Sequence, residues 1–299
     1  MPFWELRVGT SPETSEGLTN FLWEQGALGV VEEEAPGSPP RLRAFYPETA
    51  AAPKLLSAVV TYCHALTALG LPRATAEPEI APLLDGEWAT AWQQAFPPLA
   101  VGETLLIVPP WERTAAPDRT AIVIEPARAF GTGQHGSTEG CLRLLESLAH
   151  HRWEGSGPPR RLLDIGTGTG ILAIAAIKLG ADRVRAIDFD PDAVAATRHN
   201  AGLNGCEARI DADLGDPAAA NDETPYDLVL ANLLTHTHLA LAHRYAGLVS
   251  EDGDLIVGGI LAEEDSRVEA ALASVGFEMH ERLVVDGWSS LRLRRARHG

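Results

Sequence analysis

The chain has 299 residues, 45% of them hydrophobic and 22% charged, which is typical of a soluble globular protein and excludes a disordered or collagen-like chain. Its length predicts about two domains, and its formal net charge of −17 opposes attraction to nucleic acid or to an anionic membrane. This negative charge is compatible with a basic partner, although a charge of this kind more commonly serves to keep a protein soluble.

Three cysteines, Cys63, Cys141 and Cys206, lie far apart in the chain, so neither a zinc site nor a disulfide framework is expected. His236 and His238 resemble a metal-binding pair, but on a helix they would point about 200° apart. No secretory signal is visible at the N-terminus, and no apolar run approaches the ~18 residues of a membrane helix. We therefore predict a cytoplasmic protein with neither a metal site nor a membrane segment.

Residues 1–81 have the pattern of a small α+β domain. Alternating polarity predicts its strands, and the pair Ser11-Pro12 predicts the start of a helix. The predicted strands are Phe3–Thr10, Gly29–Glu33, Arg41–Tyr46 and Arg73–Ile80, and the predicted helices are Pro12–Gln25 and Ala51–Leu69. Their order, β-α-β-β-α-β, indicates a ferredoxin-like fold, which many binding modules share.

Residues 82–128 are expected to form a bridge between two domains. The predicted elements are a helix over Glu87–Phe96 and strands over Thr104–Val108 and Ala121–Ile124. Trp88 and Trp92 share one face of that helix, which Pro97 ends. We expect the two tryptophans to pack between the domains, and a platform that faces the substrate is the alternative.

Residues 129–299 change to strands that alternate with helices, which predicts a doubly wound, mostly parallel sheet. The predicted strands are Arg161–Ile165, Arg183–Phe189, Tyr226–Asn232 as the fourth, and Gly253–Ile260 as the fifth. The predicted helices are Ile171–Leu179, Pro191–Leu203 and one that begins near Glu139, and the tail, Phe277–Asp286 with Trp288–Arg294, is an antiparallel hairpin. Such sheets bind ligands beyond the carboxyl ends of their strands, so functional residues are expected at 164–170, 188–190, 211–214 and 231–235.

A glycine-rich turn follows the first of these strands, over Asp164–Gly170. Its glycines, among them Gly166 and Gly168, let the backbone approach a ligand and expose the N–H groups of the following helix. Asp188 ends the second strand, at the point where a carboxylate accepts hydrogen bonds from both hydroxyls of an adenosine ribose. Position, spacing and context together predict a nucleoside cofactor rather than a tight turn with a surface aspartate nearby.

The third glycine of this turn, Gly170, comes one residue earlier than in a dinucleotide fingerprint, where Ile171 stands instead. A G-x-G-x-G turn followed by an acidic residue on the second strand is the pattern of class I methyltransferases that use S-adenosylmethionine. That cofactor has no phosphates, so we expect the turn to surround its methionine carboxylate and ribose. The pattern favours methyl transfer over hydride transfer, and an oxidoreductase would require tight binding of NAD.

Asn232 ends the fourth strand, in Ala231-Asn232-Leu233-Leu234. In methyltransferases that act on nitrogen this position often holds Asn or Asp, whose oxygen accepts a hydrogen bond from the attacking amine. A lysine must first lose a proton, because its ordinary pKa is ~10.4, and a partly desolvated site favours the neutral amine. No Asn-Pro-Pro-Tyr sequence occurs here, which disfavours a planar amide or a purine nitrogen as acceptor. Such an asparagine alone is more often structural, but beside the glycine turn we predict a catalytic role.

The segment Phe130–Thr138 reads Phe-Gly-Thr-Gly-Gln-His-Gly-Ser-Thr and precedes the first helix of this region. Its glycines, aromatic residue and hydroxyls indicate a loop that folds over a ligand, although a helix-capping turn has the same pattern. The hydroxyl of Thr138 is expected either to cap the helix or to reach the cofactor.

With these motifs together, the sequence resembles the ribosomal protein L11 methyltransferases of the PrmA type. The resemblance rests on Phe130–His135, Asp164–Ala176, Ile187–Pro191, Ala231–Leu234 and Gly259–Leu261, with further likeness at Trp88–Phe96 and Pro110–Glu112. It covers most of the chain from residue 84 onward and is only architectural before that. The family has Pro-Thr-Thr where this chain has Gly136-Ser137-Thr138, and Asn-Ile-Leu-Ala where this chain has Asn232-Leu233-Leu234-Thr235.

The resemblance implies a methyltransferase that acts on the lysine ε-amino and N-terminal α-amino groups of L11, a basic ribosomal protein. Residues 1–81 would recognise this protein, and residues 129–299 would bind S-adenosylmethionine. The implied cofactor contacts are Thr138, Gly166, Gly168, Asp188 and Asn232, with Asn232 nearest the transferred methyl. We expect a monomer that does not bind nucleic acid directly. The alternatives are another protein lysine or a small-molecule amine as acceptor, and a non-catalytic adaptor that retains the fold.

Overall fold

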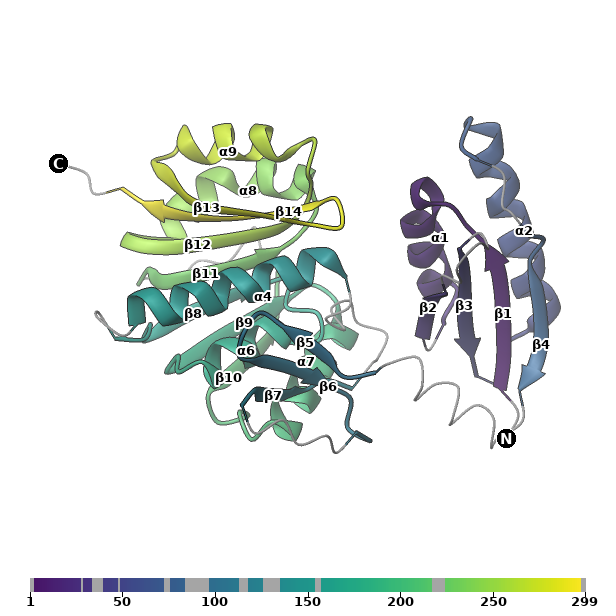
Figure 1. Ribbon diagram of the computed structural model, residues 1–299, viewed down its shortest axis with the longest axis horizontal. Helices are drawn as coiled ribbons and strands as arrows, with labels where there is room; N and C mark the ends of the chain where they lie inside the picture. Colours follow the sequence, from purple (N-terminus) through teal and green to yellow (C-terminus); the bar gives the residue numbers. More distant parts are fainter. Residues whose placement is uncertain are drawn as a thin grey trace. The chain divides into compact units, whose positions relative to one another are not determined.

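A computed structural model describes residues 3–27, 29–33, 40–47, 49–72, 76–83, 97–112, 118–125, 135–153, 157–216 and 224–296 of the chain. Contacts between Cα atoms divide the chain into two compact units, Met1–Pro97 and Pro98–Gly299 (Figure 1). The division into residues 1–81, 82–128 and 129–299 stays a prediction. The helix predicted over Glu87–Phe96, with Trp88 and Trp92, lies outside the described residues.

The first unit has the predicted β-α-β-β-α-β order. Its elements are β1 (Phe3–Gly9), α1 (Pro12–Glu24), β2 (Gly29–Glu33), β3 (Arg41–Tyr46), α2 (Ala52–Ala68) and β4 (Glu79–Leu83). The strands form an antiparallel sheet in the order β2-β3-β1-β4, which confirms the ferredoxin-like prediction. The last strand was expected at Arg73–Ile80, but β4 lies later in the chain and includes Pro82, opposite Trp4. A proline is tolerated there because β4 is an edge strand.

One face of this sheet packs against α1 and α2. The core consists of apolar side chains from alternate positions of β1 and β3 and from one stripe of each helix, among them Leu6, Val8, Leu42, Ala44, Leu18, Leu22, Leu55 and Val59. Alternation along a strand and the i, i+4 repeat along a helix place these residues on the facing surfaces. These two repeats are the reason that the sequence pattern predicted this unit.

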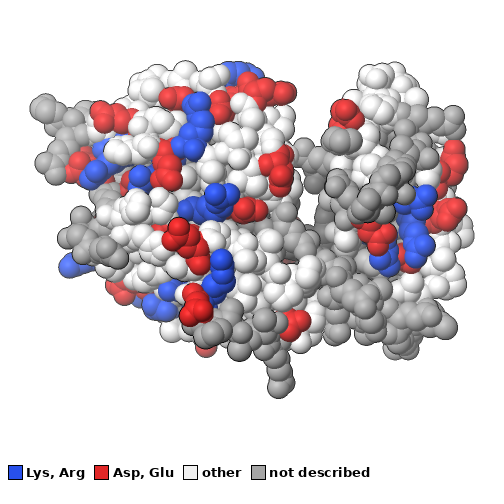
Figure 2. Space-filling model, in the orientation of Figure 1, with Lys and Arg blue, Asp and Glu red and all other residues white. Residues whose placement is uncertain are grey.

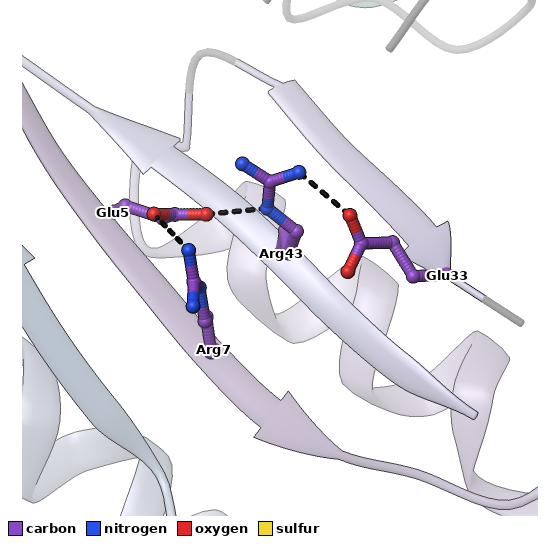
Figure 3. Close-up of polar contacts among 4 residues, drawn as sticks. All are labelled: Glu5, Arg7, Glu33 and Arg43. Carbon is purple, nitrogen blue, oxygen red and sulfur yellow. Dashed lines mark hydrogen bonds and ion pairs between the residues drawn. The ribbon is translucent and has the colours of Figure 1, made fainter. Parts of the chain in front are cut away.

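The opposite face of the sheet carries a network of charged side chains around Glu5 (Figure 3). The Glu5 carboxylate is only 3% exposed and accepts hydrogen bonds from the guanidinium groups of Arg7, at 2.9 Å, and Arg43. Arg43 also donates to Glu33, at 2.6 Å. Burial opposes ionisation of Glu5, but the hydrogen bonds and charges of the two arginines outweigh it and lower its pKa.

Replacement of Glu5 by glutamine is expected to lower the free energy of unfolding of this unit by about 2 kcal/mol at pH 7, because the hydrogen bonds from Arg7 and Arg43 lose their buried, charged acceptor. The folded-state pKa of Glu5 is lowered, so its stabilisation is complete above the unfolded pKa and disappears as the pH falls through the folded value. Hydrogen exchange of the β1 and β3 amides in urea measures both effects. The control is Glu33→Gln, since Glu33 is half exposed; an equal loss in both variants would contradict the prediction.

The second unit begins with three short strands and continues as an alternation of helices and strands within the described residues. The elements up to the switch in sheet order are β5 (Leu99–Val101), β6 (Leu105–Val108), β7 (Thr120–Val123), α4 (Gly136–Leu148), a π-helical turn (Ala149–Trp153), β8 (Arg161–Ile165), α6 (Ile171–Lys178), β9 (Arg183–Asp188), α7 (Pro191–Leu203) and β10 (Ile210–Leu214). They are followed by β11 (Tyr226–Asn232), α8 (Thr235–Leu248), β12 (Val249–Leu261), α9 (Asp265–Ala273), β13 (Phe277–Val285) and β14 (Trp288–Arg295).

The large sheet of this unit has the strand order β10-β9-β8-β11-β12-β14-β13. Neighbours from β10 to β12 are parallel, and β14 is antiparallel to both β12 and β13. This arrangement confirms the doubly wound, mostly parallel sheet of a class I methyltransferase. The strand order reverses between β8 and β11, and a crevice outside the carboxyl ends of strands at such a point is where these sheets bind ligands.

Helices cover both faces of the large sheet (Figure 1). Apolar side chains of α4, α6, α7 and the small β5-β6-β7 sheet form one core, and those of α8 and α9 form a second core on the other face. The helix α6 reads Ile-Leu-Ala-Ile-Ala-Ala-Ile-Lys and is buried as far as Ile177. None of the helices in the described ranges is long and apolar enough to cross a membrane.

Several boundaries in this unit differ from the predictions by one residue, and two differ by more. The helix α4 begins at Gly136 instead of near Glu139, because the Nδ1 atom of His135 accepts a hydrogen bond from the Ser137 amide and caps the helix. The strand β12 begins at Val249 instead of Gly253. Its partner β11 pairs with Val249 and then with Asp254, so the turn-forming residues between them are accommodated as a bulge.

Candidate functional site

The glycine turn between β8 and α6 lies at the point where the strand order reverses. Gly166 and Gly170 have φ angles of +68° and +81°, which favour glycine. A Cβ atom at Gly166 would lie 2.5 Å from Cδ2 of Leu233, and one at Gly170 would lie 2.9 Å from Cγ2 of Thr197. The turn is thus packed closely on its outer side, and its shape requires these glycines.

Two side chains of the helix α7 form hydrogen bonds with the same turn. Its Thr197 hydroxyl donates to the Gly168 carbonyl at 3.0 Å, and its Asn200 amide donates to the Thr169 carbonyl at 2.9 Å. Both carbonyls are therefore satisfied by side chains of α7, which holds the turn in its observed shape.

Asp188 ends β9 and is bonded directly to this turn. Its Oδ2 atom accepts the Gly168 amide and its Oδ1 atom accepts the Asp190 amide, each at 3.0 Å. A carboxylate oxygen has two lone pairs, so each atom retains capacity for one more donor, such as a ribose hydroxyl. The structure therefore brings Gly168 and Asp188 together as the spacing in the sequence predicts.

Asp164, at the end of β8, is a buried carboxylate to which the sequence analysis assigned no separate role. Its Oδ2 atom accepts the Thr167 hydroxyl at 2.7 Å, and its Oδ1 atom has no hydrogen bond within the described part of the chain. Burial raises the pKa of Asp164 to about 7, against the Thr167 hydroxyl and the Ala173 amide, which lower it, and the Asp188 charge raises it further. A buried acceptor beside the glycine turn suits a positively charged or N–H donor group of a ligand.

Asn232 and Thr138 meet at the carboxyl end of β11. The Asn232 amide nitrogen donates to the hydroxyl of Thr138, on the first turn of α4, at 3.3 Å. The Oδ1 atom of Asn232 is buried and has no hydrogen-bonding partner among the described residues. The fold thus joins two predicted site residues from distant segments, with one amide oxygen that no described residue satisfies.

Gly259, on β12, packs closely against the side chain of Asn232. Its φ angle is +75°, and a Cβ atom there would lie 2.5 Å from the Leu233 carbonyl oxygen and 3.0 Å from Oδ1 of Asn232. Backbone atoms cannot move away as a flexible side chain can. The register of β11 and β12 therefore depends on glycine at this position.

Replacement of Gly259 by alanine is expected to lower the free energy of unfolding by about 3 kcal/mol, from a left-handed backbone and the contact with the Leu233 carbonyl. Thermal or urea denaturation measures this change. The matched control is Gly202→Ala in α7, where a Cβ atom meets nothing within 4 Å. The control should be stabilised by up to about 1 kcal/mol; similar changes in both variants would refute the role of the contact.

Three exposed apolar side chains lie at or just after the carboxyl ends of strands of the large sheet, and the sequence analysis did not single them out. Phe189, Leu214 and Leu234 are 76%, 62% and 52% exposed, after or at the ends of β9, β10 and β11. All three lie at the edge of the sheet where ligands bind in folds of this kind. The signal in the sequence was an apolar residue at or within two positions of the end of each strand.

The remaining predictions concern histidines and a loop. Residues 126–134, with most of the Phe-Gly-Thr-Gly-Gln-His segment, lie outside the described residues, whereas His135 caps α4. His236 is exposed and His238 is buried, so they do not share a site. Over the described ranges, no group of three His, Cys, Asp or Glu side chains is placed to hold a metal ion.

These residues fit S-adenosylmethionine. The closely packed glycine turn and the oxygens of Asp188 suit the ribose of a nucleoside. The Asp164 and Asn232 oxygens that have no partner among the described residues suit the cationic amino-acid end of this cofactor. When bound, the cofactor supplies an electrophilic methyl group.

Comparison with known proteins agrees with this interpretation. The family model described as "Ribosomal protein L11 methyltransferase (PrmA)" matches residues 2–296. Proteins of that name from Bacillus cereus (strain B4264) and Bacillus anthracis (strain A0248) are each 30% identical over 99% of this chain and 100% of their own. The crystal structure of ribosomal protein L11 methylase from Lactobacillus delbrueckii subsp. bulgaricus is 31% identical, with a TM-score of 0.59 over 67% of this chain and 99% of that one. The chain therefore belongs to the PrmA family of S-adenosylmethionine-dependent ribosomal protein L11 methyltransferases.

Proposed function

We propose that this chain transfers methyl groups from S-adenosylmethionine to the lysine ε-amino groups and the N-terminal α-amino group of ribosomal protein L11. The observation that carries the proposal is the contact between Asn232 and Thr138. The Asn232 amide oxygen, which has no partner in the described part of the chain, lies at the carboxyl end of β11, at the same sheet edge as the glycine turn and Asp188. Family membership supports the choice of L11 as the substrate.

In this proposal Gly166, Gly168 and Asp188 hold the nucleoside part of the cofactor. Thr138 fixes the amide nitrogen of Asn232, so that the amide oxygen faces the incoming amine. A neutral oxygen accepts a hydrogen bond from an uncharged amine without favouring the ammonium form as a carboxylate would. This matters because the ammonium form of a lysine has no lone pair to attack with.

The finer statements about partners stay predictions. We expect residues 1–81 to recognise L11, the protein to be a cytoplasmic monomer, and nucleic acid not to bind directly. Support for the last point comes from the net charge of −17 and from Figure 2, where the basic side chains in view alternate with acidic ones over the described part of the second unit. In the second unit, Arg183 pairs with Asp211 and Arg185 pairs with Asp213.

The test is a reaction of the purified chain with S-adenosylmethionine and unmethylated L11, followed by mass spectrometry of the L11 peptides. Methyl groups on lysine ε-amino groups and on the N-terminal α-amino group are the expected result. Methylation of another protein or of a small amine in a cell extract, with L11 unmodified, would contradict L11 as the substrate. It would still support activity as a methyltransferase. Sedimentation in the same buffer tests the monomer.

A further inference from the structure

The fully buried histidine of α8 has a defined tautomer. His238 places Nε2 2.8 Å from the Gly258 carbonyl oxygen and Nδ1 3.0 Å from the Tyr245 hydroxyl. A carbonyl oxygen only accepts, so Nε2 carries the proton and donates to it. The Nδ1 atom is then a bare acceptor, and the Tyr245 hydroxyl donates to it. Both nitrogens are therefore satisfied by groups of the protein interior.

The Gly258 carbonyl that His238 contacts belongs to the last hydrogen bond between β11 and β12. It also accepts the Leu233 amide at 3.0 Å, and Leu233 directly follows Asn232. Asn232 and Gly258 themselves are partners in the parallel register. The end of a strand ladder has no further hydrogen bonds to hold it, so a second donor to this carbonyl fixes the place where the ladder ends.

The same backbone lies against the side chain of Asn232. A Cβ atom at Gly258 would come within 3.2 Å of the Asn232 Oδ1 atom, and one at Gly259 within 3.0 Å. Movement of the Gly258 carbonyl therefore changes the surface on which the Asn232 amide rests. A small change of this kind matters at a reacting centre, where a displacement of about 1 Å costs up to about 100-fold in rate.

Burial keeps the imidazole neutral, as a permanent hydrogen-bond donor requires. It lowers the pKa of His238 to about 4, although the Gly258 and Leu233 carbonyls raise it, and the nearby His236 lowers it further. The ring has no exposed surface and does not contact a substrate directly.

We propose that His238 is a positioning residue, which acts through the Gly258 carbonyl to fix the end of the β11–β12 ladder and with it the orientation of Asn232. The proposal rests on the proposed function of Asn232 in methyl transfer. It assigns to α8 a role in catalysis beyond packing against the sheet. Two hydrogen bonds connect α8 to β12 in this way, from the Tyr245 hydroxyl to His238 and from His238 to the Gly258 carbonyl.

The test compares His238→Leu with His238→Gln, whose amide nitrogen reaches the place of Nε2 and donates to the same carbonyl. In the leucine variant we expect kcat for L11 methylation to fall about tenfold and the Leu233 amide to exchange its hydrogen at least about tenfold faster. The Kd for S-adenosylhomocysteine should stay within about twofold, because Asp188 and the glycine turn are untouched. The glutamine variant should recover most of both losses. The control is His243→Leu, an exposed histidine on the same helix, which should change neither.

Three results would overturn the proposal. The first is a lower melting temperature of the leucine variant with unchanged kcat, which means that His238 only packs. The second is a parallel loss of cofactor affinity and kcat, and the third is the absence of rescue by glutamine. Failure of the wild-type chain to methylate L11 would refute the proposed function instead. Hydrogen exchange of the Leu233 amide would still show whether His238 fixes the end of the β11–β12 ladder.

Discussion

Replacement of Asp188 by alanine is expected to weaken binding of S-adenosylhomocysteine at least about 100-fold, as measured by titration calorimetry. The carboxylate accepts the Gly168 and Asp190 amides in a buried setting. A hydrogen bond to a charged group contributes about 1.5–3 kcal/mol, and each 1.4 kcal/mol is about tenfold in Kd. Loss of the two hydrogen bonds from the Gly168 and Asp190 amides loosens the glycine turn. Loss of the remaining lone pairs of the carboxylate removes the acceptor that we assign to the ribose hydroxyls.

The control is Asp211→Ala, on the neighbouring strand β10. Asp211 is an exposed carboxylate that pairs with Arg183 and belongs to no part of the proposed site. Its removal should leave the Kd within about twofold, because exposed ion pairs contribute little. Wild-type affinity in a folded Asp188→Ala protein would mean that the nucleoside is held elsewhere.

Replacement of Asn232 by alanine is expected to lower kcat for L11 methylation about 100-fold while the Kd for S-adenosylhomocysteine rises much less. The variant lacks the amide oxygen that we assign to the incoming amine, and an oriented hydrogen bond at a reacting centre is worth about 100-fold or more. Single-turnover kinetics with saturating cofactor separates the two quantities.

Thr138→Val provides a graded comparison for the same site. It removes the hydroxyl that accepts the Asn232 amide nitrogen but keeps Asn232 itself. The expected loss in kcat is about tenfold, since the amide is then less well oriented but still present. A kcat within about threefold of wild type in Asn232→Ala would contradict the catalytic assignment.

Where local patterns decide the structure, the sequence predicted the fold well. The strands Gly29–Glu33 and Arg41–Tyr46 and the helix Pro191–Leu203 have the predicted bounds. The helix begins after the Asp190 cap with Pro191 at its first position, a signal that needs no tertiary contact. The shift of β4 past Pro82 and the early start of β12 depend on the partner strands, which the local sequence does not reveal.

The same distinction applies to the site. Gly168 and Asp188 lie within one β-α-β unit, so their spacing was enough to predict that they meet. Asn232 and Thr138 come from distant segments, so the residues alone left open whether Thr138 caps the helix or reaches the cofactor, and the resemblance to a family favoured a common site.

Two buried groups received no role from the sequence. His238 lies on the buried stripe of α8 with Leu241, Tyr245 and Leu248, so the helical repeat gave a signal, but its hydrogen bonds depend on β12. The unsatisfied oxygen of Asp164 becomes visible only when its neighbours are placed.

The most direct test of the proposed site is a crystal structure of the chain with S-adenosylhomocysteine. The account predicts that the ribose hydroxyls bond to Asp188, that the amino-acid end lies at the glycine turn near Asp164, and that the sulfur lies beside Asn232. A nucleoside bound away from Asp188, or a sulfur atom out of contact with the Asn232–Thr138 pair, would contradict it.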